Sequence, residues 1–306
     1  MRVQSAVSKE IKGGSIAIGT FDGVHLGHRE VLAKVKEKGE IRGITTGIVT
    51  FDPPPISFFH KEFPFLLTPT QEKLTLLKET GIDFCWIIEF SEKIANLSPL
   101  EFLDKLQREL SPQVLVVGYD FRFGKESEGD ISFLKRVKDK YPWELVIVPP
   151  IKKSGILVKS TTIREKLLLG NIPLANLLLG RRYAIFGEVV KGMGRGREIG
   201  FPTINLTLKE KNKLLPIDGV YAVYFYPDSS KPLFYKGVAN IGKRPTFGEK
   251  ERQIEVHLIG IKEVDFPLKE VKVDFLQRIR PEKRFPNLEE MRAQIREDIE
   301  KAEKIF

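Results

Sequence analysis

The sequence predicts two domains of different fold class: an α/β domain built on a parallel sheet, then a mainly-β domain that closes into a small barrel and ends in a helix. In the first half, short apolar runs alternate with segments of helical periodicity, which is typical of repeated strand–helix units. From residue 183, short alternating segments separated by glycine and proline predict antiparallel strands. A chain of 306 residues is long enough for two domains of ordinary size.

The strands of the first half are apolar along their whole length, which indicates that they are buried on both faces of a parallel sheet. We expect them over residues 15–19, 45–51, 84–88, 114–117 and 145–148. We expect helices over residues 29–38, 68–81 and 159–170, and one over residues 130–138 that Asp130 caps. Another begins after Ser98, with Glu101 completing a capping box. Thr68, followed by Pro69 and Gln71, predicts an N-cap with a capping box. Three prolines at 53–55 predict a stiff surface loop after the second strand.

The second half begins with a short helical connector over residues 171–182. We therefore place the domain limits at 1–170 and 183–306. The predicted strands of the barrel lie at residues 183–190, 219–226, 234–241, 253–259 and 271–275. Asn287 and Glu290 predict the start of a terminal helix. Its apolar stripe is expected to pack on the barrel and consists of Leu288, Met291, Ile295, Ile299 and Ala302.

Composition limits the function classes without choosing among them. The formal net charge of +9 suits an anionic partner, either nucleotides or nucleic acid. No apolar run is long enough to span a membrane, and no leader sequence is recognisable at the start. The single cysteine, Cys85, rules out an internal disulfide bond. We therefore expect a cytoplasmic protein that does not bind a membrane.

The segment from Gly19 to His28 is the first candidate site. It contains Gly23, Gly27 and the pair His25 and His28 between a predicted strand and a predicted helix. The first amides of a helix have no intrahelical partner and favour anions, and imidazoles can donate to phosphate oxygens. No Lys-Ser/Thr pair follows the glycines, so this is not a P-loop. Two bland alternatives are that the histidines merely cap the helix or form half of a zinc site. The flanking strand and helix favour a phosphate site over simple helix capping. The scarcity of His and Cys in the chain argues against a zinc site.

Two further segments of the first half are candidates for ligand contacts. Asp120 follows a predicted strand, where ligands bind in parallel sheets. Phe121 and Phe123 flank an arginine, and they are equally compatible with a plug at the domain edge and with a wall against a flat ring. Hydroxyl groups at the start of a helix, together with an arginine one turn later, predict a second phosphate site; these residues are Ser160, Thr161 and Arg164. The bland alternative is an N-cap beside a surface arginine.

In the second half, a glycine- and arginine-rich segment from Gly187 to Thr203 predicts a loop whose amides cradle phosphate. Thr203 and Asn205 offer hard oxygens suited to nucleotide-bound Mg²⁺. A second conspicuous segment spans residues 237–247. The apolar neighbours of Glu255 predict a buried mid-strand carboxylate, which suits a general base. The alternative is a solvated strand residue.

Taken together, these segments resemble the bacterial bifunctional riboflavin kinase/FMN adenylyltransferase family, also called FAD synthetase. The resemblance is carried, in order along nearly the whole chain, by IGTFDGVHLGHREVL, TFDPPP, VVGYDFRFG, STTIR, LGRRY, GREIGFPTINL, DGVYAV, GVANIGKRPTF, IEVHL and NLEEMRAQIREDIEKA. It implies a Rossmann-like nucleotidyltransferase domain followed by a six-stranded barrel with a C-terminal helix. It also implies that the C-terminal domain converts riboflavin and ATP to FMN, and that the N-terminal domain converts FMN and ATP to FAD and pyrophosphate, both with Mg²⁺.

The resemblance also implies roles for individual residues. In the adenylyltransferase site, His25 and His28 would bind ATP phosphates, assisted by Gly19, Phe21, Asp22, Gly23, Gly27, Ser160, Thr161 and Arg164. The flavin contacts of that domain would be Asp120, Phe121 and Phe123. In the kinase site, ATP would lie against Gly187, Gly194, Gly200, Pro202 and Thr203. Thr203 and Asn205 would hold Mg²⁺, Asn240 and Arg244 would contact the flavin, and Glu255 would accept the proton of the ribityl 5′-hydroxyl.

Several positions depart from the usual pattern of that family. Pro54 stands where a histidine is common, Lys159 replaces a serine, and Ile204 replaces an alanine. Ser127 and Glu128 lie where an arginine often occurs. Two alternatives are an adenylyltransferase for another phosphorylated acceptor fused to a non-catalytic barrel and, ranked lower, a nucleic-acid-binding protein. We expect no nucleic-acid partner, and a monomer or weak oligomer.

Overall fold

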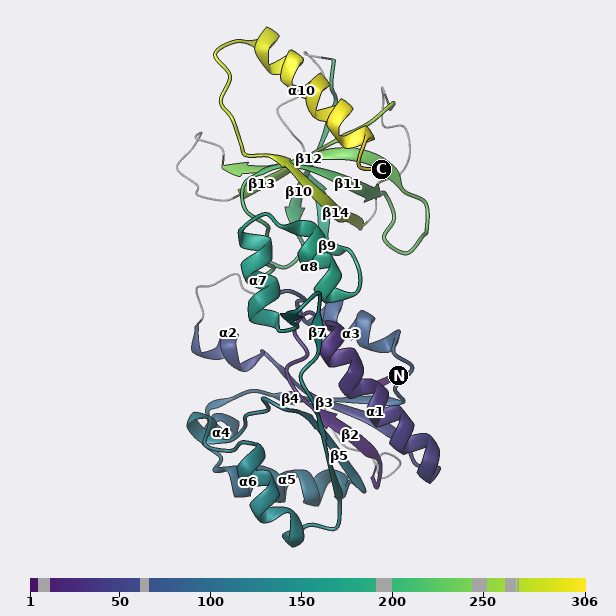
Figure 1. Cartoon of the computed structure of the whole chain (residues 1–306), viewed down its shortest axis with the longest axis vertical. Helices are drawn as coiled ribbons and strands as arrows, with labels where there is room; N and C mark the ends of the chain where they lie inside the picture. The colour runs from purple at the N-terminus through teal and green to yellow at the C-terminus, as the bar shows by residue number, and fades with distance from the viewer. Residues whose placement is uncertain (5–11, 61–65, 191–199, 244–251, 262–267, 269) are drawn as a thin grey trace. The chain divides into compact units, whose positions relative to one another are not determined.

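The computed structural model of the chain describes residues 1–4, 12–60, 66–190, 200–243, 252–261, 268 and 270–306. It divides into two compact units, Met1–Ser160 and Thr161–Phe306 (Figure 1). Helix α7 (Ser160–Leu168) and helix α8 (Ile172–Leu179) belong to the second unit, apart from Ser160. The domain limits given by the sequence, 1–170 and 183–306, remain predictions.

The first unit is built on a six-stranded sheet in which every neighbouring pair is parallel. The strand order is β1-β4-β3-β2-β5-β6. The strands are β1 (Arg2–Gln4), β2 (Ser15–Ile18), β3 (Thr46–Asp52), β4 (Phe84–Glu89), β5 (Val114–Gly118) and β6 (Glu144–Val148). The predicted parallel α/β class is confirmed, and only the three-residue edge strand β1 was not expected.

Helices cover both faces of this sheet (Figure 1). The helices of this unit are α1 (Leu26–Arg42), α2 (Pro55–Phe59), α3 (Thr70–Lys78), α4 (Glu92–Ala95), α5 (Pro99–Leu110) and α6 (Ile131–Val137), of which α2 contributes no residue to either core. A small hairpin, β7 (Lys152–Lys153) and β8 (Ile156–Leu157), follows the sheet. One core packs Leu103 of α5 against β2 and β5, and the opposite core packs Leu32 of α1 and Leu77 of α3. Burial on both faces explains why these strands are apolar throughout.

Some expected caps are present and others are not. Ser98 forms the predicted capping box with Glu101, and Asp130 caps α6 through the amide of Phe133. Thr68 is not an N-cap, because α3 begins at Thr70 and the side chain of Thr68 bonds elsewhere. Of the three prolines expected in a stiff surface loop, Pro53 and Pro54 lie between β3 and α2, whereas Pro55 begins helix α2.

The second unit is a closed barrel of six antiparallel strands in the order β10-β13-β12-β11-β14-β9. The strands are β9 (Tyr183–Val190), β10 (Thr203–Leu208), β11 (Gly219–Tyr226), β12 (Tyr235–Lys243), β13 (Arg252–Leu258) and β14 (Val271–Arg280). The barrel and its six strands confirm the expected fold. Strand β10 was not among the strands predicted from the sequence, and its first residue, Thr203, was expected at the end of a loop.

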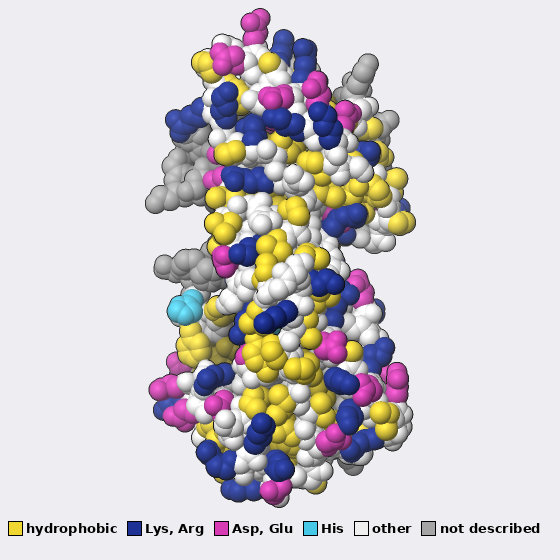
Figure 2. Space-filling model, viewed as in Figure 1, with side chains coloured by type: hydrophobic (Ala, Val, Ile, Leu, Met, Phe, Trp, Pro, Cys, Tyr) yellow, Lys and Arg dark blue, Asp and Glu magenta, His cyan; other side chains and the backbone are white. Residues whose placement is uncertain are grey.

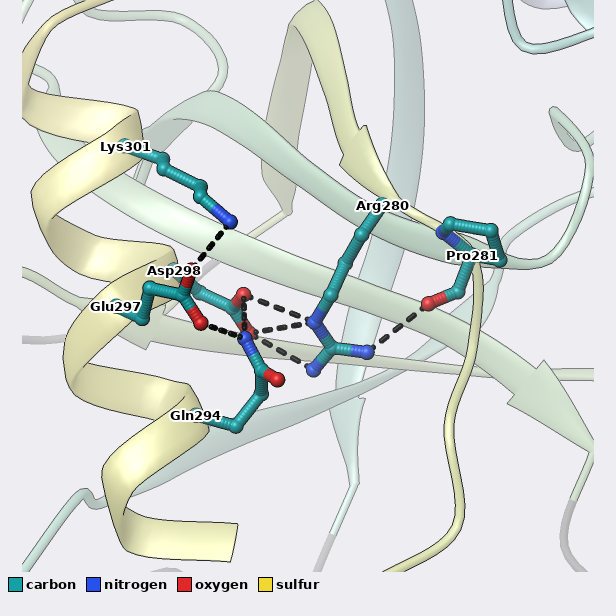
Figure 3. Close-up of polar contacts among 6 residues, drawn as sticks. All are labelled: Arg280, Pro281, Gln294, Glu297, Asp298 and Lys301. Carbon is teal, nitrogen blue, oxygen red and sulfur yellow. Dashed lines mark hydrogen bonds and ion pairs between the residues drawn. The ribbon is translucent and has the colours of Figure 1, made fainter. Parts of the chain in front are cut away.

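The chain ends in helix α10 (Leu288–Glu303), which Asn287 caps as predicted. Ile299 and Ala302 pack against Val220 and Val238 on the outside of the barrel. Leu288, at the other end of the expected stripe, is 58% exposed, so only the C-terminal half of the stripe packs on the barrel. Arg280 of β14 holds the helix through a buried ion pair with Asp298 (Figure 3).

Candidate active sites

Two predicted site segments follow neighbouring strands at the carboxyl end of the parallel sheet. Strand β2 lies between β3 and β5, and the chain continues from β2 toward β3 on one side and reaches β5 and β6 on the other. This is the switch point of the sheet, where ligands bind beyond the carboxyl ends of the strands in doubly wound folds. The turn of residues 19–25 follows β2, and residues 119–124 follow β5. The first unit therefore presents both segments at the place where such folds bind nucleotides.

His25 and His28 form one structural unit at the start of α1. We expected His28 in the loop before the helix. Because α1 begins at Leu26, His28 instead lies in its first turn, and His25 is the N-cap. The Nδ1 atom of His25 accepts a hydrogen bond from the amide of His28 at 3.2 Å, and the two rings stack with centroids 3.6 Å apart. A Cβ at Gly27 would lie 3.2 Å from the ring of His25, so the glycine lets that ring pack closely. Two imidazoles at a helix N-terminus suit a phosphate ligand.

The side chains of Asp22 and Ser160 contact the protein itself. The Asp22 carboxylate, 5% exposed, accepts hydrogen bonds from the amides of Leu67 and Thr68 at 3.1 and 2.9 Å. The Ser160 hydroxyl donates to the carbonyl oxygen of Asp22 at 2.8 Å. Their predicted contacts with ATP remain predictions. These bonds show that both residues hold the turn between β2 and α1.

Thr161 and Arg164 follow Ser160 in helix α7. They belong to the second unit, and their predicted role at the phosphates remains a prediction.

On the other side of the switch point, the Asp120 carboxylate is half exposed and forms an ion pair with Lys159 at 2.9 Å. Phe123 is 8% exposed and belongs to the core of the first unit. The ring of Phe121 stacks on that of Phe123 with centroids 5.2 Å apart, and Phe121 stays partly exposed. Phe123 is thus a core residue, whereas the flat-ring contact predicted for both remains a prediction.

The barrel brings four predicted residues into two adjacent rows. In the strand register, Glu255 of β13 lies opposite Asn205 of β10 on one side and opposite Asn240 of β12 on the other. Thr203 lies opposite His257 in the next row on the same face. Residues directly opposite each other in neighbouring strands have their side chains close together on one face. An oxygen-rich surface therefore forms from strands that are far apart in sequence.

Glu255 is partly exposed, so the expected burial is not found. The alternating residues Ile254 and Val256 are 1% and 0% exposed because they fill the barrel interior. Period-two alternation then places Glu255 and the two asparagines on the outer face. This is also the face on which Val220 and Val238 meet helix α10.

His257 was not predicted as a site residue, although in the structure it contacts the backbone next to Thr203. Its Nδ1 atom lies 2.9 Å from the carbonyl oxygen of Pro202, and the ring of Phe201 meets it edge-on. Burial lowers the pKa of His257, and the hydrogen bond to Pro202 partly opposes that shift. A neutral ring that donates from Nδ1 fixes the residue immediately before Thr203. No local sequence pattern indicated this contact.

The predicted phosphate-binding loop is shorter than expected at both ends. Gly187 lies within strand β9, where a Cβ would be 2.7 Å from the carbonyl oxygen of Thr207. Gly187 therefore allows two strands to approach closely, and Gly200 has a φ of +81° just before β10. Gly194 and Arg244 lie outside the described residues. Their predicted roles, and that of Pro202 toward ATP, remain predictions.

The donor set on the barrel face fits Mg²⁺. Thr203 and Asn205 supply a hydroxyl and an amide oxygen on the same face of β10. Among the residues that the structure describes, no group of three or more His, Cys, Asp or Glu could hold a metal ion. Few protein ligands are needed for Mg²⁺, which usually keeps several waters and binds substrate phosphates.

Comparisons with known proteins cover both units. The FAD synthetase family model matches residues 7–162, and the riboflavin kinase family model matches residues 179–306. The bifunctional riboflavin kinase/FMN adenylyltransferase of Escherichia coli (strain K12) is 38% identical over 297 residues, covering 96% of this chain and 93% of that protein. Its counterpart in Bacillus subtilis (strain 168) is 34% identical, covering 98% of this chain and 95% of that protein.

Among solved structures, this chain resembles a protein from Streptococcus pneumoniae described as a macrolide-efflux protein. The TM-score is 0.85, the identity is 28%, and the match covers 97% of each chain. Within the part of this chain that the structure describes, no helix is both long and apolar enough to cross a membrane. With both family models matched in order and relatives matched over nearly their full length, the chain belongs to the bifunctional riboflavin kinase/FMN adenylyltransferase family.

Proposed function

We propose that the chain makes FMN and then FAD, with one reaction in each unit. The second unit transfers the γ-phosphoryl group of ATP to the ribityl hydroxyl of riboflavin, which gives FMN and ADP. The first unit transfers the adenylyl group of another ATP to the phosphate of FMN, which gives FAD and pyrophosphate. The order of the two matched family models and the bifunctional relatives support this assignment.

In the kinase reaction, Glu255 accepts the proton of the attacking ribityl hydroxyl. Its position between Asn205 and Asn240 is the single observation that supports this role best, because the amides can orient the carboxylate and the substrate. Thr203 and Asn205 would hold Mg²⁺, which offsets charge on the ATP phosphates when bound. His257 keeps Thr203 in place through Pro202. The chain's own contribution is positioning and one proton transfer.

In the adenylyl transfer, His25 and His28 bind ATP phosphates at the N-terminus of α1 and stabilise the charge that develops on the α-phosphate. The FMN phosphate is itself the nucleophile, so no protein nucleophile is required. Asp120 and Phe121, at the carboxyl end of β5, contact the flavin. Their place across the switch point from the histidines supports this arrangement.

One pair of substitutions tests both assignments on the same protein. Glu255→Gln should lower FMN formation from riboflavin at least 100-fold, the usual scale for losing a general base, while FMN is still converted to FAD. His28→Ala should do the reverse and let FMN accumulate. Glu188→Gln, the same change at an exposed position of strand β9, is the matched control and should alter neither reaction.

Chromatography of riboflavin, FMN and FAD with fluorescence detection reads both steps in one incubation. Normal FMN formation by Glu255→Gln would refute the assigned base. Unchanged riboflavin, with added FMN also untouched, in the unaltered chain would favour an adenylyltransferase for another phosphorylated acceptor fused to a non-catalytic barrel.

Nucleic-acid binding has less support than flavin synthesis. On the face shown in Figure 2, Lys and Arg side chains are interspersed with acidic ones over both units rather than gathered in one continuous stripe. We infer a cytoplasmic enzyme that acts as a monomer or weak oligomer and binds no nucleic acid. Retardation of an oligonucleotide at low salt would contradict that view.

A further inference from the structure

The turn that leads into His25 has an unfavourable backbone conformation. Phe21 and Val24 have φ values of +51° and +38°, which residues other than glycine rarely adopt. Gly23, between them, has a φ of +88°. The side chains of Phe21 and Val24 are 2% and 0% exposed. Such a conformation persists only where the surrounding structure enforces it.

Thr68, which lies 45 residues after Gly23 in the chain, holds this turn in its conformation through hydrogen bonds. Its Oγ1 atom accepts a hydrogen bond from the amide of Gly23 at 2.7 Å and donates its proton to the Asp22 carboxylate at 3.3 Å. The same carboxylate accepts from the backbone amides of Leu67 and Thr68. A hydroxyl has one proton to donate and can accept as well, so both capacities of Thr68 are used within the turn.

Thr68 is placed to act on the turn rather than on a ligand. It is 3% exposed, and its partner Asp22 is 5% exposed. The two residues that it holds, Asp22 and Gly23, come three and two positions before His25, which in turn caps helix α1 and stacks on His28. A loss of this contact would therefore move the imidazoles and the first amides of α1 together.

We infer that Thr68 is a positioning residue for adenylyl transfer, because it clamps the turn that orients His25, His28 and the N-terminus of α1. This inference rests on the proposed reaction of the first unit. Adenylyl transfer has no protein nucleophile here, so its rate depends on how well the phosphates are placed. A displacement of about 1 Å in such groups can reduce a rate about 100-fold.

The test compares Thr68→Val, Thr68→Ser and a matched control. Valine keeps the shape of threonine but neither accepts from Gly23 nor donates to Asp22, whereas serine keeps the hydroxyl. The control is Thr46→Val. Thr46, 7% exposed, makes the same kind of paired bond with Asp83, at 2.7 and 3.1 Å, but at the amino end of β3, which is the opposite end of the sheet.

We expect Thr68→Val to lower kcat for FAD synthesis from FMN by about tenfold to 100-fold, with KM for FMN changed less than about threefold. Thr68→Ser should restore most of the rate. Riboflavin phosphorylation, measured in the same samples, should stay unchanged in all variants. The fluorescence of Trp86 and Trp143, the two tryptophans of the chain, reports thermal unfolding of the first unit alone and should shift similarly for Thr68→Val and Thr46→Val.

Equal loss of FAD synthesis in Thr68→Val and Thr46→Val, or no rescue by serine, would overturn the inference and reduce Thr68 to a stability role. If Thr68→Val does not fold, Asp22→Asn breaks the same clamp from its other side, and an unchanged kcat in that variant would also overturn it. If the unaltered chain makes no FAD, the adenylyltransferase assignment itself fails, and the inference fails with it. A normal rate of FAD synthesis in both the unaltered chain and Thr68→Val would instead refute only the role of Thr68.

Discussion

The ion pair between Arg280 and Asp298 should decide how firmly helix α10 is held against the barrel. The Asp298 side chain is 3% exposed and that of Arg280 is 16% exposed. The guanidinium donates to both carboxylate oxygens at 2.8 to 3.0 Å and to the Pro281 carbonyl oxygen at 2.9 Å (Figure 3). In Arg280→Met, the buried carboxylate loses the guanidinium and keeps the hydrogen bond from the side-chain amide of Gln294, at 3.2 Å.

Breaking a buried ion pair by removing one partner costs about 3–5 kcal/mol. Because Arg280 is partly exposed and Gln294 remains, we expect the lower limit, about 3 kcal/mol. At about 1.4 kcal/mol for each tenfold change, the opening equilibrium of α10 should shift roughly 100-fold. A buried pair replaced by apolar residues is often neutral in stability, so the double variant Arg280→Met/Asp298→Leu should recover most of the loss.

Native-state hydrogen exchange of the peptides that cover residues 288–303, followed by mass spectrometry, measures this opening directly. Lys301→Met is the matched control, since Lys301 pairs with Glu297 on the same helix at 2.7 Å but both side chains are about half exposed. Exposed i,i+4 pairs contribute only about 0.3–0.5 kcal/mol. Protection within threefold of the parent in Arg280→Met, or an equal loss in Lys301→Met, would refute the reasoning.

Two further predictions concern titration and local charge. Burial lowers the pKa of His257, partly opposed by Pro202, so the unfolded chain binds that proton at a higher pH than the folded chain does. The stabilising contribution of the neutral ring is complete above the ordinary value of 6.5 and is lost as pH falls through the folded value. Calorimetry should therefore show the second unit losing stability below pH 6.5 more steeply than in His257→Gln, and parallel curves would contradict this. Lys159→Ala should change stability by less than about 1 kcal/mol but leave the Asp120 carboxylate without this ion pair at the proposed flavin site, which should raise KM for the anionic substrate FMN in FAD synthesis several-fold. The increase should shrink at high salt, and an unchanged KM at low salt would refute it.

Local sequence patterns were sufficient for most elements of the fold. Helix α5 was predicted from Ser98 and Glu101, and the capping box is present because the two residues lie only three positions apart in the chain. At Thr68 the same kind of pattern was misleading. The buried Asp22 carboxylate needs hydrogen-bond donors, and it takes the amide and hydroxyl of Thr68. A distant buried charge thus overrode a local capping preference, and nothing within a few residues of Thr68 indicates that.

The candidate sites were predictable by residue type more than by arrangement. Glu255 and Asn205 were identified from short motifs, but their placement in one row depends on the pairing of β10 with β13, fifty residues later. The expected burial of Glu255 was wrong for the same reason. Its apolar neighbours face the barrel interior, and alternation places the carboxylate on the outer face. The role of His257 was not predicted, because its partner is a backbone carbonyl group, which every residue has and which no sequence pattern distinguishes.

Thr68 and His257 solve the same physical problem in different folds. Phosphoryl and adenylyl transfer require accurate placement of charged groups more than covalent chemistry by the protein. In each unit, a side chain from a distant segment bonds to the backbone just before the residues that we propose to face the ligand: Thr68 to the amide of Gly23, and His257 to the carbonyl of Pro202. Each contact lies within its own compact unit, with its own apolar core. Loss of either should therefore impair one reaction and spare the other, because each contact positions groups of its own unit and the two contacts share no partner.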